Sequence, residues 1–139
     1  MRILATFILS ASLVSTGASA FDLEHLKQLK ETNACSKCDL SDADLSDLDL
    51  AKAIINRTNL SGANLSGANL MFANLVGSRL IGANMTETNL SAANVSGANM
   101  KGANLTDAKL IRARLRGANL AETNLTGTNM KGANLSDIT

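Results

Sequence analysis

An apolar position recurs every five residues over most of the chain. Each multiple of five from 40 to 135 carries an aliphatic side chain: fifteen are Leu, three are Met, and the others are Ile55 and Val95. Two residues earlier stands a small residue, usually Ala, and between the two stands Asn or Asp in most units. This order, inward, outward and inward over three residues, is the alternation of an extended backbone.

The two remaining positions of each unit are predicted to form a corner. Because five is odd, a continuous strand would turn the next Leu to the outside, so the chain must bend between units. All nine glycines after residue 20 occupy the second of these two positions, where a turn can require a positive φ. If each bend is about 90°, four units close a square coil, and the twenty units give about five coils stacked ~4.8 Å apart.

The units "ANLSG", "ANLTD", "ADLSD" and "ANMKG" resemble the A-(D/N)-L-x-x units of the pentapeptide repeat family. The resemblance covers residues 38–139 and implies an all-β fold, the right-handed quadrilateral β-helix of that family. The sequence departs from the family pattern at a few positions, which are Leu48, Ile54, Arg79, Lys109 and Arg114.

Residues 21–33 are predicted to form a short α-helical cap. Apolar residues at 23, 26 and 29 alternate with charges at helical spacing, and Asp22 can cap the start. Such a helix would cover the first edge of the coil stack and protect it against edge-to-edge association.

The first twenty residues are typical of a secretory signal peptide. Arg2 precedes an apolar run, and Ala18-Ser19-Ala20 is a cleavage signal of the small-x-small type. The alternative is an uncleaved membrane anchor, but the run is short for the ~20 residues of a spanning helix.

We therefore expect three segments: a signal peptide (1–20), a helical cap with a CxxC junction (21–37) and the repeats (38–139). No integral membrane segment is expected after cleavage, and the expected location is the periplasm, with the thylakoid lumen or the medium as alternatives.

The last unit, "ANLSDIT", is still in register, so no cap is apparent at that end. Either the last coil frays, or it meets the same edge of a second copy in a homodimer.

The charge of the chain argues against binding of nucleic acid and suggests an anionic partner. Without the first twenty residues the chain has 12 Lys and Arg against 12 Asp and Glu, a balance that does not favour nucleic acid. A local basic patch nevertheless stands within eight residues, and it suggests an anionic partner or a membrane surface; it comprises Lys109, Arg112, Arg114 and Arg116.

Cys35 and Cys38 are the strongest candidates for reactivity. Haem attachment fails because Asp39 follows the second Cys, and a zinc site with His25 would lack a fourth ligand. A thioredoxin-like pair belongs to a strand-to-helix junction, which is absent from this order of elements. The pair is expected to lock the helix to the first coil, either as a disulfide or as two small buried residues.

An exposed apolar cluster is predicted where the repeat changes. Met71 and Phe72 replace Ser and Gly at one corner, and Val76 and Ile81 follow at the first corner position of the next two units. Such a cluster can mark a contact surface for a partner protein.

The favoured function is a non-enzymatic exported scaffold that presents flat faces to an unknown partner protein or to itself, with no cofactor and no metal. An enzyme would need a pocket, for which only the junction of His25, Cys35 and Cys38 offers a place.

The family resemblance also implies binding of DNA gyrase by mimicry of duplex DNA, although such members are acidic and cytosolic. A further alternative is ice binding by a hydroxyl column, formed by Ser46, Ser66, Thr86, Thr106 and Thr126.

Overall fold

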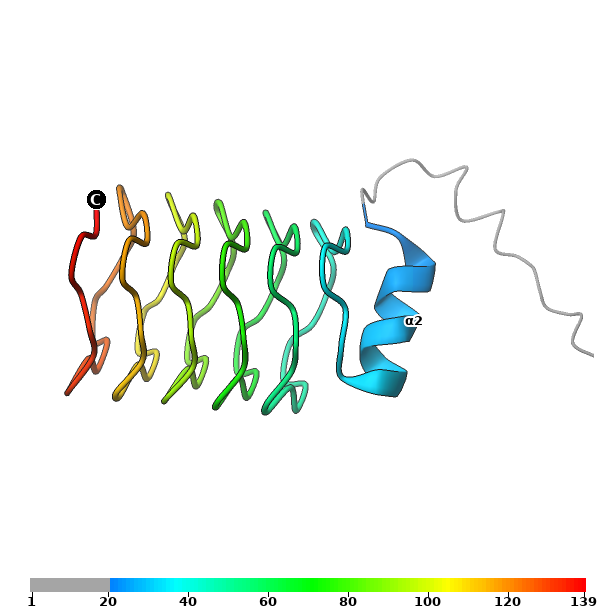
Figure 1. Cartoon of the computed structure of the whole chain (residues 1–139), viewed down its shortest axis with the longest axis horizontal. Coiled ribbons are helices and arrows are strands. Elements are labelled where there is room, and N and C mark those ends of the chain that lie inside the picture. Colours follow the sequence, from blue (N-terminus) through cyan, green and yellow to red (C-terminus); the bar gives the residue numbers. More distant parts are fainter. Residues whose placement is uncertain (1–20) are drawn as a thin grey trace, which may run out of the picture.

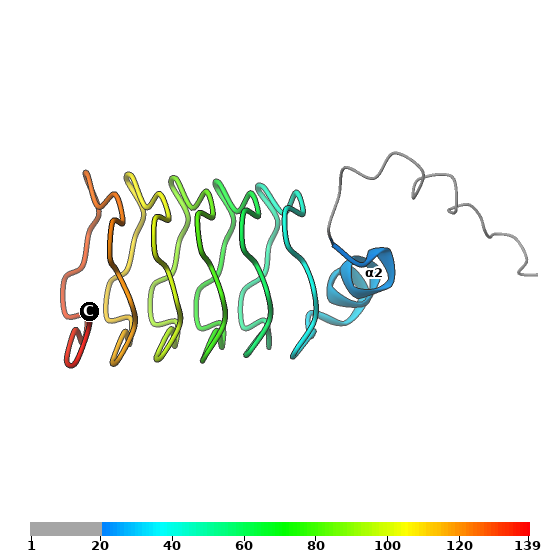
Figure 2. The ribbon, with the colours of Figure 1, turned by 90° about the horizontal axis from the view of Figure 1, so that it is seen from above.

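The computed structural model describes residues 21–139, so the predicted signal peptide lies outside the described residues. One helix, α2 (Leu23–Thr32), precedes a stack of parallel coils. Two views at right angles show the coils side by side along one axis, with α2 beyond the first coil (Figures 1 and 2).

The coils pair through parallel bridges between residues twenty positions apart. Four units of five residues therefore make one turn, and four columns of paired residues mark its four sides. Side 1 contains 34, 54, 74, 94, 114 and 134; side 2 contains 39, 59, 79, 99 and 119; side 3 contains 44, 64, 84, 104 and 124; side 4 contains 49, 69, 89, 109 and 129. Sides 1 and 3 are opposite, and we name each corner by the two sides that it joins.

The interior is filled by the residues predicted to point inward. Between Leu40 and Ala118 all of them are buried except Leu48, which is half-buried. Leu48 occupies a position for small residues, but in the first coil it packs against the core and lines a groove beside α2, so a large side chain fits there. Where Ser or Thr replaces Ala, the hydroxyl donates to a carbonyl of the coil below, as Thr58 does to Cys35 at 2.6 Å.

Every corner has the same backbone conformation. The second corner residue has a positive φ in all units from 37 to 137, whether it is Gly or another residue. Gly97 (φ 66°) and Ala92 (φ 59°) illustrate both cases. The left-handed conformation costs an L-residue about 1–2 kcal/mol, which explains why glycine is frequent at this position.

The Asn and Asp residues between the two inward positions stabilise these corners. Each of the sixteen accepts the backbone N–H two residues later through Oδ1, as Asn104 does from Thr106 at 3.1 Å. This is an Asx turn, a local bond that favours a bend. The preference for Asn and Asp at this position thus reflects the corner as well as the outward direction of the side chain.

Helix α2 is fixed at both ends and along one face. Asp22 Oδ1 accepts the Glu24 N–H at 2.8 Å, and Asn33 ends the helix in the left-handed conformation. Leu29 is buried, and Leu26 packs against the same core. None of the helices in residues 21–139 is long and apolar enough to span a membrane.

Candidate functional site

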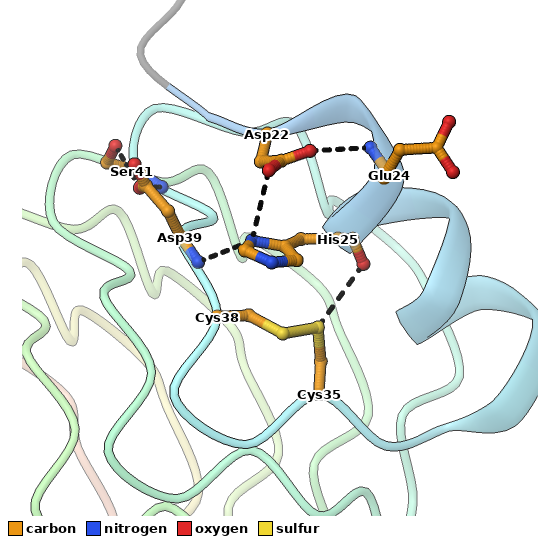
Figure 3. A network of polar contacts seen from close by, with 7 residues as sticks. All are labelled: Asp22, Glu24, His25, Cys35, Cys38, Asp39 and Ser41. Carbon is orange, nitrogen blue, oxygen red and sulfur yellow. Dashed lines mark hydrogen bonds and ion pairs between the residues drawn. A yellow bond between two sulfur atoms is a disulfide. The ribbon is translucent and has the colours of Figure 1, made fainter.

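The junction of α2 with the first coil contains a disulfide between Cys35 and Cys38, whose Cα atoms are 5.5 Å apart (Figure 3). Both side chains are buried, at 0% and 5% exposure. Cys35 Sγ lies 3.3 Å from the carbonyl oxygen of His25, but a disulfide sulfur has no hydrogen to donate, so this is a packing contact. Burial limits access of an external thiol to either sulfur, and thiol exchange depends on such access.

His25 connects the helix to the first coil. Its Nδ1 accepts the backbone N–H of Asp39 at 2.9 Å, which requires a free lone pair on that nitrogen. Nδ1 also lies 3.7 Å from Asp22 Oδ2, but an unprotonated nitrogen cannot form an ion pair with a carboxylate. The geometry of His25 is therefore that of a structural acceptor that ties α2 to the first coil.

The main groove near this junction is not lined by His25, Cys35 or Cys38, the groups considered for reactivity. One groove of about 520 Å³ lies between the end of α2 and the first coil, with Leu29, Thr32, Leu48 and Leu50 in its wall. Neither His25 nor either cysteine lines it. In residues 21–139 no three His, Cys, Asp or Glu side chains are placed to hold a metal ion.

The basic patch lies mainly on one side of the rod. Arg112 is at corner 4/1, Arg114 is on side 1 and Arg116 is at corner 1/2, so the three cross a single side within one turn, whereas Lys109 is on side 4. Arg116 Nε donates to Asp137 Oδ2 at 3.1 Å, and both side chains are about 70% exposed. Exposed pairs of this kind contribute little, so the charges remain available to a partner.

The expectation of one apolar cluster is wrong. Met71 and Phe72 lie at corner 4/1, Val76 at corner 1/2 and Ile81 at corner 2/3, because each unit turns the chain to the next side. Phe72 is 58% exposed. Ile54 is 49% exposed on side 1 and was not predicted to be an exposed apolar residue. An Ile at a position that usually holds Asn or Asp could have indicated it.

The hydroxyl column lies at corner 3/4. The hydroxyls of Ser46, Ser66, Thr86 and Thr106 each donate to the Asn or Asp Oδ1 two residues earlier. Their hydrogens are thus already engaged in the corner bonds, which weakens the case for ordering of surface water.

Asp44 has a lowered pKa because two hydrogen bonds stabilise its carboxylate. The Ser46 hydroxyl donates to Asp44 Oδ1 at 2.6 Å, and the Ser46 N–H donates to the same oxygen at 3.1 Å. These bonds favour the carboxylate and hold the pKa of Asp44 below its ordinary value of 3.8, with a smaller contribution from Lys30.

Comparison with known proteins identifies the repeat. The family model of pentapeptide repeats matches in eight copies, over residues 35–67, 68–107 and 98–137. No curated protein matches the chain significantly.

Solved structures of pentapeptide repeat proteins are similar to this chain. Rfr23 from the cyanobacterium Cyanothece 51142 has 29% identity and a TM-score of 0.59, with 84% of this chain and 97% of that chain covered. A protein from the Arabidopsis thaliana thylakoid lumen has 29% identity and a TM-score of 0.57, with 90% and 77% covered. QnrB1, a plasmid-mediated fluoroquinolone resistance protein, has 22% identity and a TM-score of 0.34, with 76% and 64% covered, which is too distant to support an argument.

Proposed function

The chain belongs to the pentapeptide repeat family, whose fold is the right-handed quadrilateral β-helix, and on this premise we propose that it is a non-enzymatic exported scaffold. Its flat sides bind a partner protein or a second copy of the chain. Proteins of this family are in general structural or interaction proteins without enzymatic activity.

The observation that carries this proposal is the filled interior. Inward side chains such as Leu65 and Ala68 are 0–1% exposed, and the buried hydroxyl of Thr88 donates to a backbone carbonyl. A substrate would find no room among them, whereas small-molecule sites are concave and partly polar. Binding therefore takes place on the outer sides of a rod of about five coils, and α2 serves to cover its first edge.

Export is supported by the sequence pattern of residues 1–20 and by similarity to a lumenal protein from Arabidopsis thaliana. We place the protein in the periplasm, with the thylakoid lumen or the medium as alternatives. The N-terminal residue of the purified mature protein tests this assignment: we expect Phe21, and a chain that keeps residues 1–20 would contradict it.

Affinity capture from the exported compartment tests the scaffold. The wild type is compared with Met71→Ser/Phe72→Gly and with a variant in which Arg112, Arg114 and Arg116 are all Ser. Arg79→Ser, on side 2, is the matched control for loss of a surface charge. We expect at least one of the first two variants to lose a partner that the control keeps. Identical recovery from all four proteins would contradict the proposed surfaces.

An anionic partner or membrane surface is a second candidate, favoured by the three arginines across side 1. Sedimentation with vesicles that contain anionic lipid separates it from protein binding. The triple Ser variant should lose vesicle binding, while Arg79→Ser should keep it. A wild type that does not sediment with the vesicles contradicts this candidate.

A homodimer through the last coil is a further candidate. The inward residues Leu125 and Leu135 are each 38% exposed there, and association would bury them. Light scattering of the wild type and Leu135→Asp tests it, and the candidate is wrong if both proteins are monomers.

A thiol-redox function of Cys35 and Cys38 is the weakest candidate, because both sulfur atoms are in buried residues. A maleimide label, applied to the folded protein with and without reductant, measures the state of the pair. We expect labelling only after reduction; full labelling without reductant would show that the pair is not oxidised.

A further inference from the structure

The rod carries opposite charges on two opposite sides. Residues 37–139 contain ten basic and nine acidic residues. Side 1 with its two corners holds seven of the basic residues and only one acid, Asp137; the seven are Lys37, Lys52, Arg57, Arg112, Arg114, Arg116 and Lys131. Side 3 with its two corners holds six of the acids and only one base, Lys101; the six are Asp42, Asp44, Asp47, Glu87, Asp107 and Glu122.

A second copy shifted sideways by one rod width, without rotation, places side 3 of one copy on side 1 of the other. Corner 3/4 then meets corner 4/1, and corner 2/3 meets corner 1/2. Residues that meet differ by five in number, because successive corners are one unit apart. Their heights differ by about 1.2 Å, a quarter of the ~4.8 Å between paired coils, which long side chains easily span.

Along the first of these two edges the residues that meet are complementary. Asp47 meets Lys52, and Asp107 meets Arg112. The exposed ring of Phe72 meets Gly67, beside which the side chain of Asp47 lies. The charges therefore agree on this edge.

The second edge repeats this agreement. Lys37 meets Asp42, and the corner that holds Arg116 meets the corner that holds Glu122. Between them, the half-buried Val76 meets the exposed Ile81, so two apolar side chains of different corners cover each other. No two like charges of the facing corners meet at the same level on either edge.

The other sideways shift gives the reverse result. If side 2 is placed on side 4, corner 1/2 meets corner 4/1, and Lys52 meets Arg57. On the opposite edge Asp42 meets Asp47. Like charges meet on both edges, so sideways contact is favourable in one direction and unfavourable in the other.

We propose that copies of this chain associate side by side in register, with side 3 of each copy on side 1 of the next. This inference rests on the proposed scaffold function and names the partner as a second copy. The two surfaces differ, so the contact is heterologous and continues as an open row of parallel rods.

The size of the contact sets its strength. A side about 24 Å tall and about 16 Å wide buries roughly 400 Å² per copy, about half of a standard interface, so association is weak and depends on concentration. The paired charges are exposed, and salt screens such pairs within a Debye length of about 10 Å at 0.1 M. The row should therefore form at low salt and high protein concentration.

Charge reversal on one edge tests the arrangement by sedimentation at protein concentrations up to about 1 mM. The first variant is Lys52→Glu/Arg112→Glu, and the second is Asp47→Lys/Asp107→Lys. Acidic and basic residues both already occupy corner positions with positive φ, so either variant is compatible with the fold. Circular dichroism and urea unfolding verify that both variants remain folded.

We expect the weight-average mass of the wild type to rise at least about twofold with concentration at low salt and to return to the monomer at high salt. Each variant by itself should stay monomeric, because its altered edge now brings like charges together. An equimolar mixture of the two variants should associate again, since each altered edge finds its complement on the other protein.

Three outcomes would overturn the proposal: a wild type that is monomeric throughout, variants that associate as well as the wild type, or a mixture that does not recover. If the wild type stays monomeric but sediments with anionic vesicles, the basic side binds lipid instead. Failure of self-association leaves the scaffold function standing if affinity capture still recovers a partner that the side 1 variants lose.

Discussion

The last coil and the coils below it are built from the same five-residue units, yet they differ in burial. Leu65 and Leu125 occupy the same inward position on side 3, but Leu65 is fully buried and Leu125 is 38% exposed. The difference is the neighbouring coil, because each coil buries its interior only against the coils on either side. Stability in such an array is a sum of contacts between neighbours, so identical units are expected to contribute unequally.

The largest predicted effect compares these two leucines. Leu65→Ala should lower the free energy of unfolding by about 3 kcal/mol, since it creates a cavity in a closed core. Leu125→Ala should cost only about 1 kcal/mol, since water already reaches that site. Urea unfolding of both variants measures the difference, and equal losses would show that the last coil is as well packed as the interior.

The covered end should depend on its disulfide. Replacement of both Cys35 and Cys38 with Ala should cost about 2 kcal/mol, the loop-closure value for so short a loop. Amide hydrogen exchange should accelerate in α2 and the first coil and remain unchanged in the last coil. Equal acceleration throughout the rod would contradict the view that coils are stabilised by their neighbours.

A smaller contrast concerns two inward hydroxyls on side 4. Thr88 and Thr128 each donate to a carbonyl of the coil below at 2.8 Å, but Thr88 is buried and Thr128 only half-buried. Thr88→Val should cost about 1 kcal/mol and Thr128→Val about 0.5 kcal/mol, because water can replace the bond at the open end. Thermal unfolding of the two variants tests this order, and a larger loss for Thr128→Val would reverse it.

The smallest effect concerns pH. The folded-state pKa of Asp44 lies below the ordinary 3.8, so its carboxylate stabilises the fold above that value. This contribution is lost as the pH falls through the lowered pKa. The Asp44→Asn variant keeps an oxygen that can accept the Ser46 N–H, just as Asn124 Oδ1 accepts the equivalent Thr126 N–H in the last coil. Unlike Asp44, the Asn side chain does not titrate.

Urea unfolding at pH 5 and near pH 2.5 should therefore show a smaller loss of stability for Asp44→Asn than for the wild type. Asp22→Asn, at the start of α2, is the control, because it removes one carboxylate at a different site. If the wild type and Asp44→Asn lose equal stability, the hydrogen bonds of Ser46 do not favour the charged form.

Much of this fold follows from local pattern. The five-residue frame identified the inward residues and the corners, because an odd repeat with two inward positions requires a bend. The reason for Asn and Asp was found only partly: their outward direction was predicted, but the Asx bond of each corner was not. The contact of His25 with Asp39 was not predictable either, since it joins a helix and a coil whose relative placement no local pattern specifies.

The sequence by itself determined what each unit is, and the tertiary structure decided which units are neighbours. Large and small inward residues specify a side and a corner wherever they occur, because the alternation of an extended backbone and the sterics of its bend act within five residues. The alignment of Lys52, Phe72 and Arg112 at one corner depends on the number of units in a turn, and bridges between residues twenty positions apart settle that number. Only that register divides a neutral chain into a basic side and an acidic side.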